Sequence, residues 1–367
     1  MIRNAILADT SSLLKLELAC FATDRLSERS FRHMIMRAHA SLLVDDVEGE
    51  IAGYSLTLFH QNTSMARLYS LAVAAKWRGQ GVAAKLLAAS EHDALSRGVV
   101  SMRLEVNVHN RAAIALYTRQ GYCEFALVDD YYEDHTAAVR MQKALAPNLA
   151  PSVSRVPYYA QTLEFTCGPA SLMMAMKALS PNMRLDRRLE LRIWREATSI
   201  FMTSGHGGCS AYGLALAAFH RGLDVKVFTL DDIEMFVNSV RSPEKREVIR
   251  IVQDDFLREI RRLKIPLEAH HLSLQTMATA LHEGAVAMVL ISAYRLTGDK
   301  SPHWVVVCGL DTRFVYIHEP YVDREKGKTE TTCLGIPVTH KEFERMRFYG
   351  VRRQYATLLL SKKSKGN

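Results

Sequence analysis

Apolar and polar residues in the first half of the chain follow the patterns of strands and helices. An apolar run at 69–73 is typical of a short strand, and residues 102–108 predict a second one. Between them, residues 82–97 have the spacing of a helix, and Gly98 is a typical helix stop. This alternation predicts an α/β domain.

The second half of the chain shows a different order of elements. A helix is predicted at 170–179, and a Val-rich strand at 304–310 is followed by a turn at 311–313 and a second strand at 314–318. An amphipathic helix is predicted within 241–262. The apolar residues at helical spacing there are Val248, Ile251, Val252, Phe256 and Ile260.

Residues 146–157 separate the two halves. They contain three prolines and no apolar periodicity, which is typical of a linker of some stiffness. The chain has 367 residues, enough for two domains that each bury a core. We therefore expect one domain at 1–145, a second at 158–361 and a basic tail at 362–367.

The composition indicates ordinary globular packing. Hydrophobic residues make up 48% of the chain, no apolar run reaches the length of about 20 residues that spans a membrane, and the first residues carry no signal-peptide pattern. We expect a cytoplasmic protein without membrane partners. Its six cysteines are expected as reduced thiols without a metal, because their spacing forms no ligand pairs. The net charge of +8 is spread along the chain, so we expect no nucleic-acid partner.

Cys167 is the first candidate for chemistry. It follows Gln161 by six positions, and Gly168 and Pro169 open the predicted helix directly after it. The positive end of a helix lowers the pKa of a thiol and favours the nucleophilic thiolate. The amide of Gln161 can donate to the oxyanion that forms when a thiolate attacks a carbonyl. The alternative is a buried core cysteine, the usual fate of a single thiol.

His303 begins the Val-rich strand and is the candidate general base. If this strand forms a hairpin centred on Asp311 with the next one, position 303 faces Glu319, and opposed residues have Cβ atoms roughly 5 Å apart. Glu319 is then placed to orient the imidazole, as the third member of a catalytic triad does. Asp311 is excluded, since it lies roughly 26 Å along the strand. Without the upstream cysteine and glutamine, a structural strand histidine is the preferred interpretation.

These residues resemble the papain-like cysteine peptidases, in particular the branch that removes double-glycine leader peptides from bacteriocin precursors. That family has a glutamine, a Cys-Gly-Pro motif starting six positions later, a distant histidine that opens a Val-rich strand, and an acidic residue before proline. The resemblance covers residues 158–360 and implies an α+β papain-like fold, with Gln161 as oxyanion donor, Cys167 as nucleophile and His303 as general base. One departure is Glu319, because the family usually has aspartate there. Related enzymes also pass the acyl group to an amine.

The turn Arg78-Gly79-Gln80-Gly81 stands between the first predicted strand and helix. Glycines let the backbone approach a ligand closely, and a helix start turns its N–H groups toward an anion. The turn lacks the Lys-Ser/Thr ending of a P-loop and the third glycine of the dinucleotide fingerprint. Taken alone, it predicts an anion site only weakly, because many such turns bind nothing.

Together with a second motif, this turn resembles the GNAT acetyltransferases. That family has Arg/Gln-x-x-Gly-x-Gly/Ala and later Asn-x-x-Ala-x-x-Leu-Tyr-x-x-x-Gly-Phe/Tyr. The matching residues are Arg78, Gly81 and Ala83 in the first motif, and Asn110, Ala113, Leu116, Tyr117, Gly121 and Tyr122 in the second. The resemblance extends to the ribosomal-protein N-terminal alanine acetyltransferases, whose Leu-Glu-Val and Tyr-Tyr recur at 104–106 and 131–132. It covers residues 1–145 and implies the mixed-sheet GNAT fold.

The GNAT resemblance implies acetyl-CoA as the cosubstrate. The residues expected to hold it are Leu71, Ala72, Val73, Arg78, Gly79, Gln80, Gly81, Val82, Ala83 and Asn110. Glu105 can take the proton of an attacking amine as general base, directly or through water. The resemblance makes Tyr117 the general acid for the departing thiolate. Away from these motifs, Glu105 is interpreted as a solvated strand carboxylate and Tyr117 as a half-buried helix aromatic.

The sequence therefore predicts a bifunctional enzyme. Its first domain is expected to acetylate a peptide or protein amine, and a ribosomal-protein-like substrate fits the resemblance. Its second domain is expected to cleave a peptide. Two alternatives stay open for the second domain: it only binds a peptide partner, or it transfers its acyl group to an amine.

Overall fold

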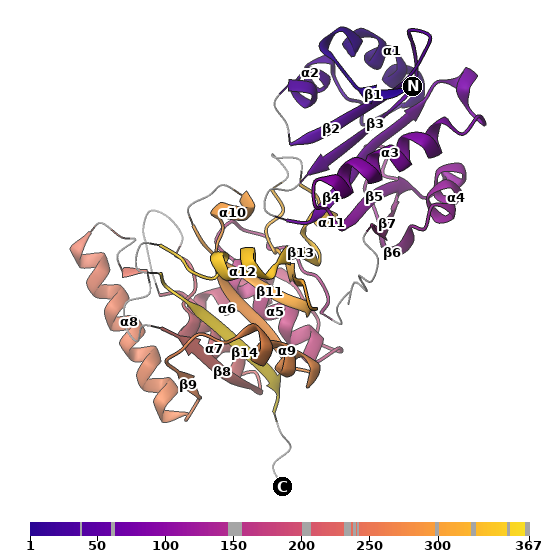
Figure 1. Cartoon of the computed structure of the whole chain (residues 1–367). Coiled ribbons are helices and arrows are strands. Elements are labelled where there is room, and N and C mark those ends of the chain that lie inside the picture. Colours follow the sequence, from indigo (N-terminus) through magenta and orange to yellow (C-terminus); the bar gives the residue numbers. More distant parts are fainter. Residues whose placement is uncertain are drawn as a thin grey trace. The chain divides into compact units, whose positions relative to one another are not determined.

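The chain divides into two compact units, Met1–Pro151 and Ser152–Asn367, which Figure 1 shows in different colours. The computed structural model describes residues 1–36, 39–59, 63–145, 156–199, 207–230, 236–237, 240, 242–297, 301–323, 328–350 and 353–363. Of the predicted linker, residues 146–155 lie outside the described residues, and so do residues 364–367 of the predicted tail.

The first unit is built on a mixed sheet. In the described part of this unit, seven strands follow the order β1-β2-β3-β4-β5-β7-β6. Neighbouring strands are antiparallel except for β4 and β5, which are parallel. The strands are β1 (Ile2–Asn4), β2 (Ala40–Val47), β3 (Glu50–Phe59), β4 (Met65–Val73), β5 (Ser101–Asn107), β6 (Cys123–Val128) and β7 (Ala138–Ala144). The two strands predicted from the sequence are the end of β4 and nearly all of β5.

Helices cover both faces of this sheet, because successive side chains of a strand point to opposite faces. Leu42 and Val44 of β2 belong to the core under α1 and α2, whereas Leu43 between them packs with residues of α3. The helices are α1 (Thr10–Cys20), α2 (Glu28–Met36), α3 (Val82–Ser96) and α4 (Arg111–Arg119), with 3-10 turns η1 (Leu7–Asp9) and η2 (Ala75–Trp77). Asn110 caps α4 by accepting a hydrogen bond from the N–H of Ala113 at 3.1 Å, which confirms its predicted position.

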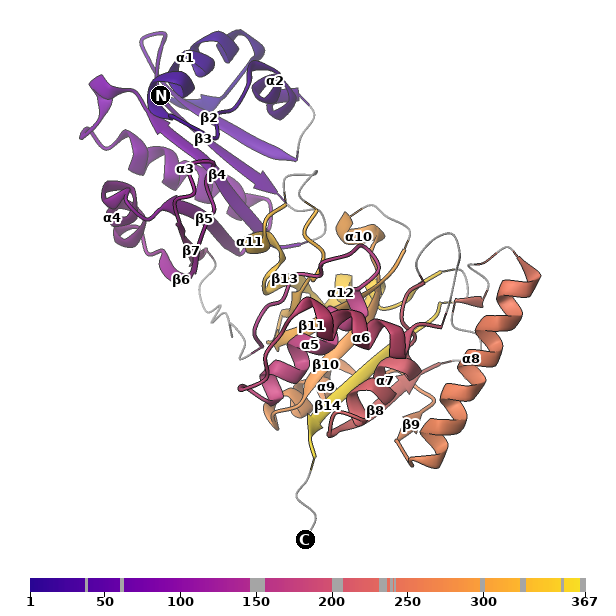
Figure 2. The same ribbon diagram turned by 180° about the vertical axis from the view of Figure 1, so that it is seen from behind.

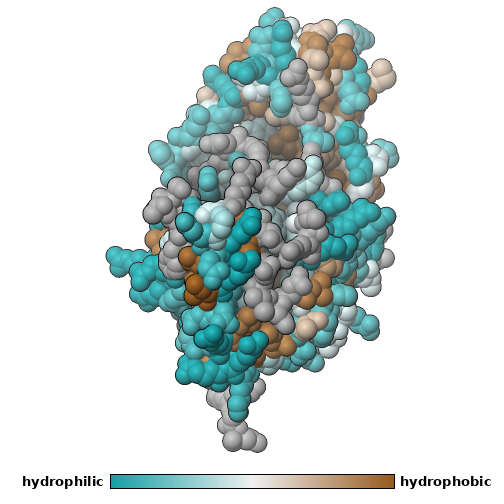
Figure 3. Space-filling model, turned by 90° about the vertical axis from the view of Figure 1, so that its left-hand side faces the viewer, coloured by the Kyte–Doolittle hydropathy of each residue, from teal (hydrophilic) through white to brown (hydrophobic). Residues whose placement is uncertain are grey.

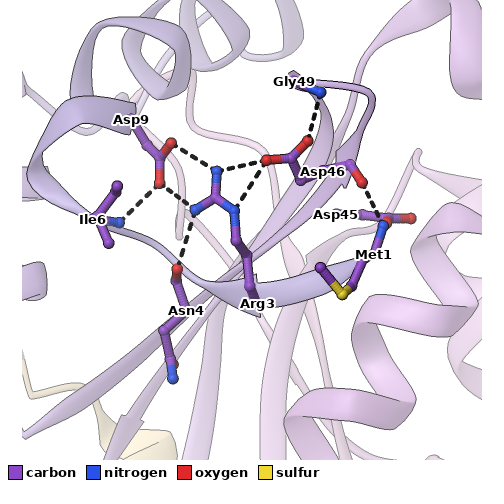
Figure 4. Close-up of polar contacts among 8 residues, drawn as sticks. All are labelled: Met1, Arg3, Asn4, Ile6, Asp9, Asp45, Asp46 and Gly49. Carbon is purple, nitrogen blue, oxygen red and sulfur yellow. Dashed lines mark hydrogen bonds and ion pairs between the residues drawn. The ribbon is translucent and has the colours of Figure 1, made fainter.

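The edge strand β1 is fixed by the charged cluster in Figure 4. The guanidinium of Arg3 donates to Asp9 at 2.7 and 3.0 Å and to Asp46 at 2.8 and 3.0 Å. These hydrogen bonds hold the pKa of both carboxyl groups below its ordinary value. Arg3 thereby joins β1 to η1 and to the end of β2.

The second unit is built on a mainly antiparallel sheet. In the part of it that the structure describes, seven strands follow the order β13-β12-β11-β10-β14-β8-β9, and β8 and β9 are parallel. The strands are β8 (Leu223–Thr229), β9 (Leu267–Glu268), β10 (Val286–Ser292), β11 (Pro302–Leu310), β12 (Phe314–His318), β13 (Ile336–Thr339) and β14 (Ala356–Lys362). The buried runs of β10 and β11 form the centre of the sheet.

Helices also lie on both sides of the second sheet. Figure 2 draws α5, α6 and α7 in front of it, and Figure 1, from the opposite side, draws α9 and α12 in front. The helix predicted at 170–179 is α5, which begins at Cys167 itself and is buried along most of its length. The helices are α5 (Cys167–Leu179), α6 (Arg187–Ala197), α7 (Ala211–Phe219), α8 (Pro243–Arg262), α9 (Leu274–His282), α10 (Tyr294–Thr297), α11 (Glu330–Cys333) and α12 (His340–Met346).

The predicted hairpin of β11 and β12 exists, but its predicted register is wrong. The prediction paired position 305 with 317, whereas Val307 is the partner of Ile317. The register also shifts between Val307 and Gly309, where a bulge adds a residue to β11. Asp311 accepts the N–H groups of Arg313 and Phe314 and closes the turn, so it has a structural role.

The predicted amphipathic helix is α8, and of the five apolar residues at helical spacing Ile260 is fully buried. Val248 and Ile251 are 44% and 60% exposed, whereas the other buried residues of the helix are Ile249, Gln253 and Leu257. The buried stripe thus overlaps the predicted one only in part, because it contains a glutamine that a count of apolar residues leaves out.

Hydrophobic side chains reach the surface without forming one dominant area on the face drawn in Figure 3. Small hydrophobic areas there are separated by hydrophilic residues. Scattered exposed apolar residues are normal for globular proteins.

Replacing Arg3 with glutamine is expected to destabilise the first unit at neutral pH, and the deficit relative to wild type should shrink in acid. Because the carboxyl pKa values of Asp9 and Asp46 are depressed from 3.8, their pairing with Arg3 stabilises the fold above that pH and is lost as the pH falls below it. Without Arg3 the gain at neutral pH disappears, and we expect a melting temperature lower by about 2 to 5 °C at pH 7. Hydrogen exchange of β1 and β2 in the full chain should show less protection than in wild type at pH 7, and the difference should narrow as the pH falls below 3.8.

The matched control is Arg32→Gln, which removes an exposed ion pair with Glu28 on α2. Equal acid sensitivity in Arg3→Gln and wild type would contradict the assigned role of the cluster.

Candidate active sites

Three residues from distant elements meet in the second unit. Cys167 begins α5, His303 lies at the start of β11, and Glu319 directly follows β12. Their exposed fractions are 7%, 8% and 1%, so all three are buried. The ring Nε2 of His303 lies 2.5 Å from Oε1 of Glu319, which confirms the contact predicted from the sequence despite the shifted register.

The imidazole of His303 is also a hydrogen-bond partner of Cys167. The thiol is hydrogen-bonded to His303 and to the backbone N–H of Trp304. Burial by itself raises the pKa of the Cys167 thiol, but the charge and hydrogen bond of His303 outweigh it, so the pKa lies below its ordinary value. The site thus favours a thiolate.

The other two members of the triad carry the complementary charges. Burial lowers the pKa of His303, but the charges of Glu319 and Cys167 raise it by more than burial lowers it, so the net shift of the pKa is upward. Burial raises the pKa of Glu319, and the pairing with His303 more than reverses this, so the net shift is downward. All three shifts favour the charged forms, a thiolate, an imidazolium and a carboxylate, which nucleophilic catalysis uses.

Gly168 is required by the crowding around the nucleophile. A Cβ atom at this position would lie 3.0 Å from Cδ1 of Leu214, 3.2 Å from Cβ of Cys209 and 3.3 Å from Cδ1 of Trp304. Trp304 also donates its ring N–H to the carbonyl of Cys209 at 3.1 Å. The glycine of the Cys-Gly-Pro motif thus allows the start of α5 to approach β11 and the segment before α7.

Gln161, the predicted oxyanion donor, lies in the loop before α5. Its backbone N–H donates to the carbonyl of Pro320 at 2.8 Å, which links the loop to the segment that carries Glu319. Its side-chain Nε2 donates to the carbonyl of Leu163 at 2.8 Å. One of its two amide hydrogens serves that bond, and the other is available for a ligand. Its role in catalysis stays a prediction.

A buried carboxylate, Glu190 of α6, is part of this site and was missed from the sequence. It accepts hydrogen bonds from Tyr159, Thr162 and Thr166, all in the loop that carries Gln161. The one signal in the sequence is its position on the helical stripe of Ile193 and Ala197, which are buried.

In the first unit, the parallel strands β4 and β5 separate along their length. Their pairing in the described residues is confined to Met65–Arg67 with Ser101–Arg103. Beyond Arg67 the side of β4 that faces β5 is open, while its other side pairs with β3 as far as Val73. The predicted ligand residues Leu71, Ala72 and Val73 lie in this open stretch. Their backbone groups on that side suit a ligand with amides.

The predicted phosphate-binding turn lies at the end of the same strand. Gly79 and Gly81 have φ of +78° and +81°, a conformation that favours glycine, and Gly81 is the N-cap of α3. A Cβ atom at either glycine would meet nothing within 4 Å, so the turn is open. Arg78 folds back to donate to the carbonyl of Val73 at 3.2 Å. An open glycine turn at the start of a long helix fits the phosphates of coenzyme A.

Glu105, the predicted general base, lies on β5 beyond the point where the strands separate. Its carboxylate is 3% exposed, so the interpretation as a solvated carboxylate is wrong. It pairs with Nε of Arg67 at 2.8 Å, and Arg67 also donates to the hydroxyl of Tyr131 at 2.8 Å. Arg67 was missed from the sequence, where nothing distinguishes it from an exposed strand arginine.

Tyr117, the predicted general acid, is buried on α4 beside Tyr122, with ring centroids 5.7 Å apart. Burial raises its pKa well above its ordinary value, so its hydroxyl stays protonated at neutral pH. A protonated phenol can donate to a leaving thiolate.

Within the described residues, no group of three or more His, Cys, Asp or Glu side chains could hold a metal ion. Nor does any helix in the described part of the chain have the length and apolar content to cross a membrane. None of the six cysteines, each in a described position, forms a disulfide.

Each unit matches the model of a known protein family or domain. Residues 156–361 match the model of the Peptidase_C39 like family, and residues 8–145 match the model of the acetyltransferase (GNAT) domain. N-alpha-acetyltransferase 30 of Schizosaccharomyces pombe is 37% identical over 82 residues, which are 22% of this chain and 55% of that protein. The chain thus spans little more than half of that relative.

Two other relatives are covered almost completely. An N-alpha-acetyltransferase of Sulfurisphaera tokodaii is 28% identical over 156 residues, which are 39% of this chain and 92% of that protein. Among solved structures, the ribosomal-protein-S18-alanine N-acetyltransferase from Escherichia coli is 26% identical with a TM-score of 0.37, and the match covers 41% of this chain and 97% of that chain.

Alkylation of Cys167 is expected to show the effect of His303 on the thiol pKa. With His303 in place the pKa lies below the ordinary 9.0, so iodoacetamide should react at pH 6 to 7, where an ordinary thiol is largely protonated. In His303→Ala the effect of burial, which is the largest one and raises the pKa, is no longer offset by the imidazole, and the rate at pH 7 should fall more than about tenfold. Mass spectrometry of the modified peptide between pH 5 and 9 measures both profiles.

The variant Cys167→Ala is the control that identifies the signal of the alkylated Cys167 peptide, because this signal must be absent from its mass spectrum. Identical pH profiles with and without His303 would exclude an activated thiol.

Proposed function

Since this chain belongs to the Peptidase_C39 like family through residues 156–361 and carries an acetyltransferase (GNAT) domain at residues 8–145, we propose that it is a bifunctional enzyme. The second unit cleaves a peptide with Cys167 as nucleophile. The first unit transfers the acetyl group of acetyl-CoA to the amine of a peptide or protein.

The observation that carries the peptidase proposal is the buried chain of contacts from Cys167 through His303 to Glu319. The thiolate attacks the carbonyl carbon of a peptide bond, a C–S bond forms, and the π electrons of the carbonyl move to its oxygen. Gln161 donates its remaining amide hydrogen to this oxyanion. The C–N bond then breaks, and His303 gives its proton to the departing amine.

Water completes the proposed reaction. The neutral His303 takes a proton from the water molecule while its oxygen attacks the acyl carbon. Collapse of the second tetrahedral intermediate breaks the C–S bond and restores the thiolate and the imidazolium. Glu319 accepts the hydrogen bond of Nε2 throughout, so the other ring nitrogen keeps facing the sulfur.

A peptidyl acyloxymethyl ketone ending in Gly-Gly is expected to modify Cys167 alone. Brief exposure followed by intact-mass spectrometry should give one adduct, because His303 lowers the pKa of the Cys167 thiol, whereas burial raises the pKa of Cys209 and Cys333. Cys167→Ala should abolish the adduct, and Glu319→Gln should slow its formation by about 10²-fold or more, since the ring then loses its orienting charge.

Cys123→Ala serves as the control, because Cys123 is the exposed thiol most open to unselective reagents. Absence of a selective adduct would leave the second unit as a peptide-binding module. A substrate peptide whose cleaved carbonyl becomes an amide in the presence of an added amine, and a carboxylic acid in its absence, would identify amine transfer.

The proposal for the first unit is carried by the opening between β4 and β5 together with the glycine turn. Bound acetyl-CoA supplies an acetyl thioester whose carbonyl the amine attacks. The backbone of 71–73 holds the ligand along the strand, and the turn at Gly79 and Gly81 accommodates its phosphates. Glu105 removes a proton from the attacking amine, and Tyr117 donates one to the thiolate that leaves.

Changes at Glu105 and Tyr117 are expected to reduce acetylation without preventing acetyl-CoA binding. Peptides that begin with alanine are the first probe, because one relative is by name an alanine N-acetyltransferase for ribosomal protein S18. Glu105→Gln and Tyr117→Phe should each lower kcat by about 10²-fold or more, as expected when a proton-transfer group is lost. Acetylated peptide measured by mass spectrometry reports the rate.

Tyr122→Phe is the matched control, because it removes a hydroxyl from the buried ring beside Tyr117. If Tyr117→Phe keeps the kcat of this control, Tyr117 is not the acid.

A further inference from the structure

Glu190 occupies an unusual position for a carboxylate. It lies in the first turn of α6 and is 0% exposed. Its Oε1 accepts from the N–H of Thr162 at 2.8 Å and from the hydroxyl of Thr166 at 2.5 Å. Its Oε2 accepts from the hydroxyls of Tyr159 at 3.0 Å and Thr162 at 2.8 Å.

These four contacts account for both oxygens of an ionised carboxylate. A carboxylate only accepts hydrogen bonds, and each of its oxygens takes two donors here. All four donors are uncharged groups of one loop, and the carboxylate lies where the dipole of α6 favours a negative charge. Glu190 therefore holds the loop through directed hydrogen bonds and not through an ion pair with a described residue.

The loop that Glu190 holds is the one that carries Gln161. Thr162 follows Gln161 directly, and Tyr159 precedes it by two positions. Thr166 is the N-cap of α5, adjacent to Cys167. The carbonyl of Leu163, which accepts the Gln161 amide at 2.8 Å, also lies 2.8 Å from the hydroxyl of Thr166. Tyr159 and Thr162 on either side of Gln161, and Thr166 beside Cys167, are thus attached to one carboxylate.

We propose that Glu190 is a positioning residue that holds the Gln161 loop so that its amide can stabilise the oxyanion at Cys167. The inference rests on the proposed peptidase function and adds a residue to that site. Glu190 acts through the loop and does not contact the substrate. Its loss should therefore affect reactions that form an oxyanion and spare reactions that need only the thiolate.

Two reagents separate these requirements. A short peptide aldehyde ending in glycinal adds to Cys167 by forming a C–S bond, while its carbonyl oxygen becomes an alkoxide that takes the proton of His303. Iodoacetamide alkylates the same sulfur with loss of iodide and forms no oxyanion. The ratio of aldehyde affinity to alkylation rate therefore reports the oxyanion site and is independent of thiolate content.

In Glu190→Ala the aldehyde affinity is expected to fall about 10- to 100-fold, as for partial loss of an oxyanion donor, while the alkylation rate at pH 7 stays within about twofold of wild type. Gln161→Ala should give the same pattern. The double variant should be no weaker than Gln161→Ala alone, because the two residues act on one interaction. Glu164→Ala, an exposed carboxylate of the same loop, is the matched control and should behave as wild type.

Glu190→Gln keeps the shape and one accepting oxygen, and its neighbouring hydroxyls can reverse to accept from the new NH₂ group. We expect it to lose about three- to tenfold in aldehyde affinity, between wild type and the alanine variant. If Glu190→Ala does not fold, the selective loss in Glu190→Gln carries the test.

Wild-type aldehyde affinity in Glu190→Gln and in any folded alanine variant would overturn the inference. So would a parallel fall of affinity and alkylation rate, which indicates general disturbance of the site. Failure of both reagents on the wild-type protein would instead overturn the proposed peptidase function itself.

Discussion

The buried pair of charges on Cys167 and His303 is the interaction on which the second unit depends. Removing a thiolate and an imidazolium from water is costly, and their attraction offsets this only where hydrogen bonds satisfy both groups. Glu319 does so for the ring, and the N–H of Trp304 does so for the sulfur. The close packing at Gly168 limits the access of water to the pair. The active site therefore requires the close packing of α5 against β11, because this packing brings Cys167 and His303 together.

Local signals predicted the elements that carry this pair, but not all of their relations. A Gly-Pro helix start and a Val-rich strand placed Cys167 and His303 correctly, because both signals act over a few residues. The predicted hairpin register left out the bulge beside Gly309, although a glycine inside a strand is a signal for a bulge. The longer side chain of Glu319 still reaches the ring across the offset.

The sequence did not indicate which distant residues pair with the buried charged side chains. Glu190 receives its donors from a loop 24 to 31 residues earlier, and Glu105 pairs with Arg67, 38 residues earlier. Each of these groups has the composition of a surface residue and no local pattern that indicates burial. The predicted strand 69–73 and the turn at residues 78–81, by contrast, lie at the end of β4 and directly before α3, where the local pattern predicts them.

The separation of β4 from β5 has a consequence for the stability of the first unit. Beyond Arg67 the described residues form no ladder between β4 and β5, and at the end of this stretch the carbonyl of Val73 accepts from Arg78 and Cys20. Proteins usually cover strand edges that lack a partner strand. A ligand with amide groups, such as the pantetheine arm of coenzyme A, would complete the ladder in the manner of an added strand. Occupancy and folding are then thermodynamically linked, so the ligand-free enzyme in a cell short of coenzyme A would be the form most exposed to unfolding and proteolysis.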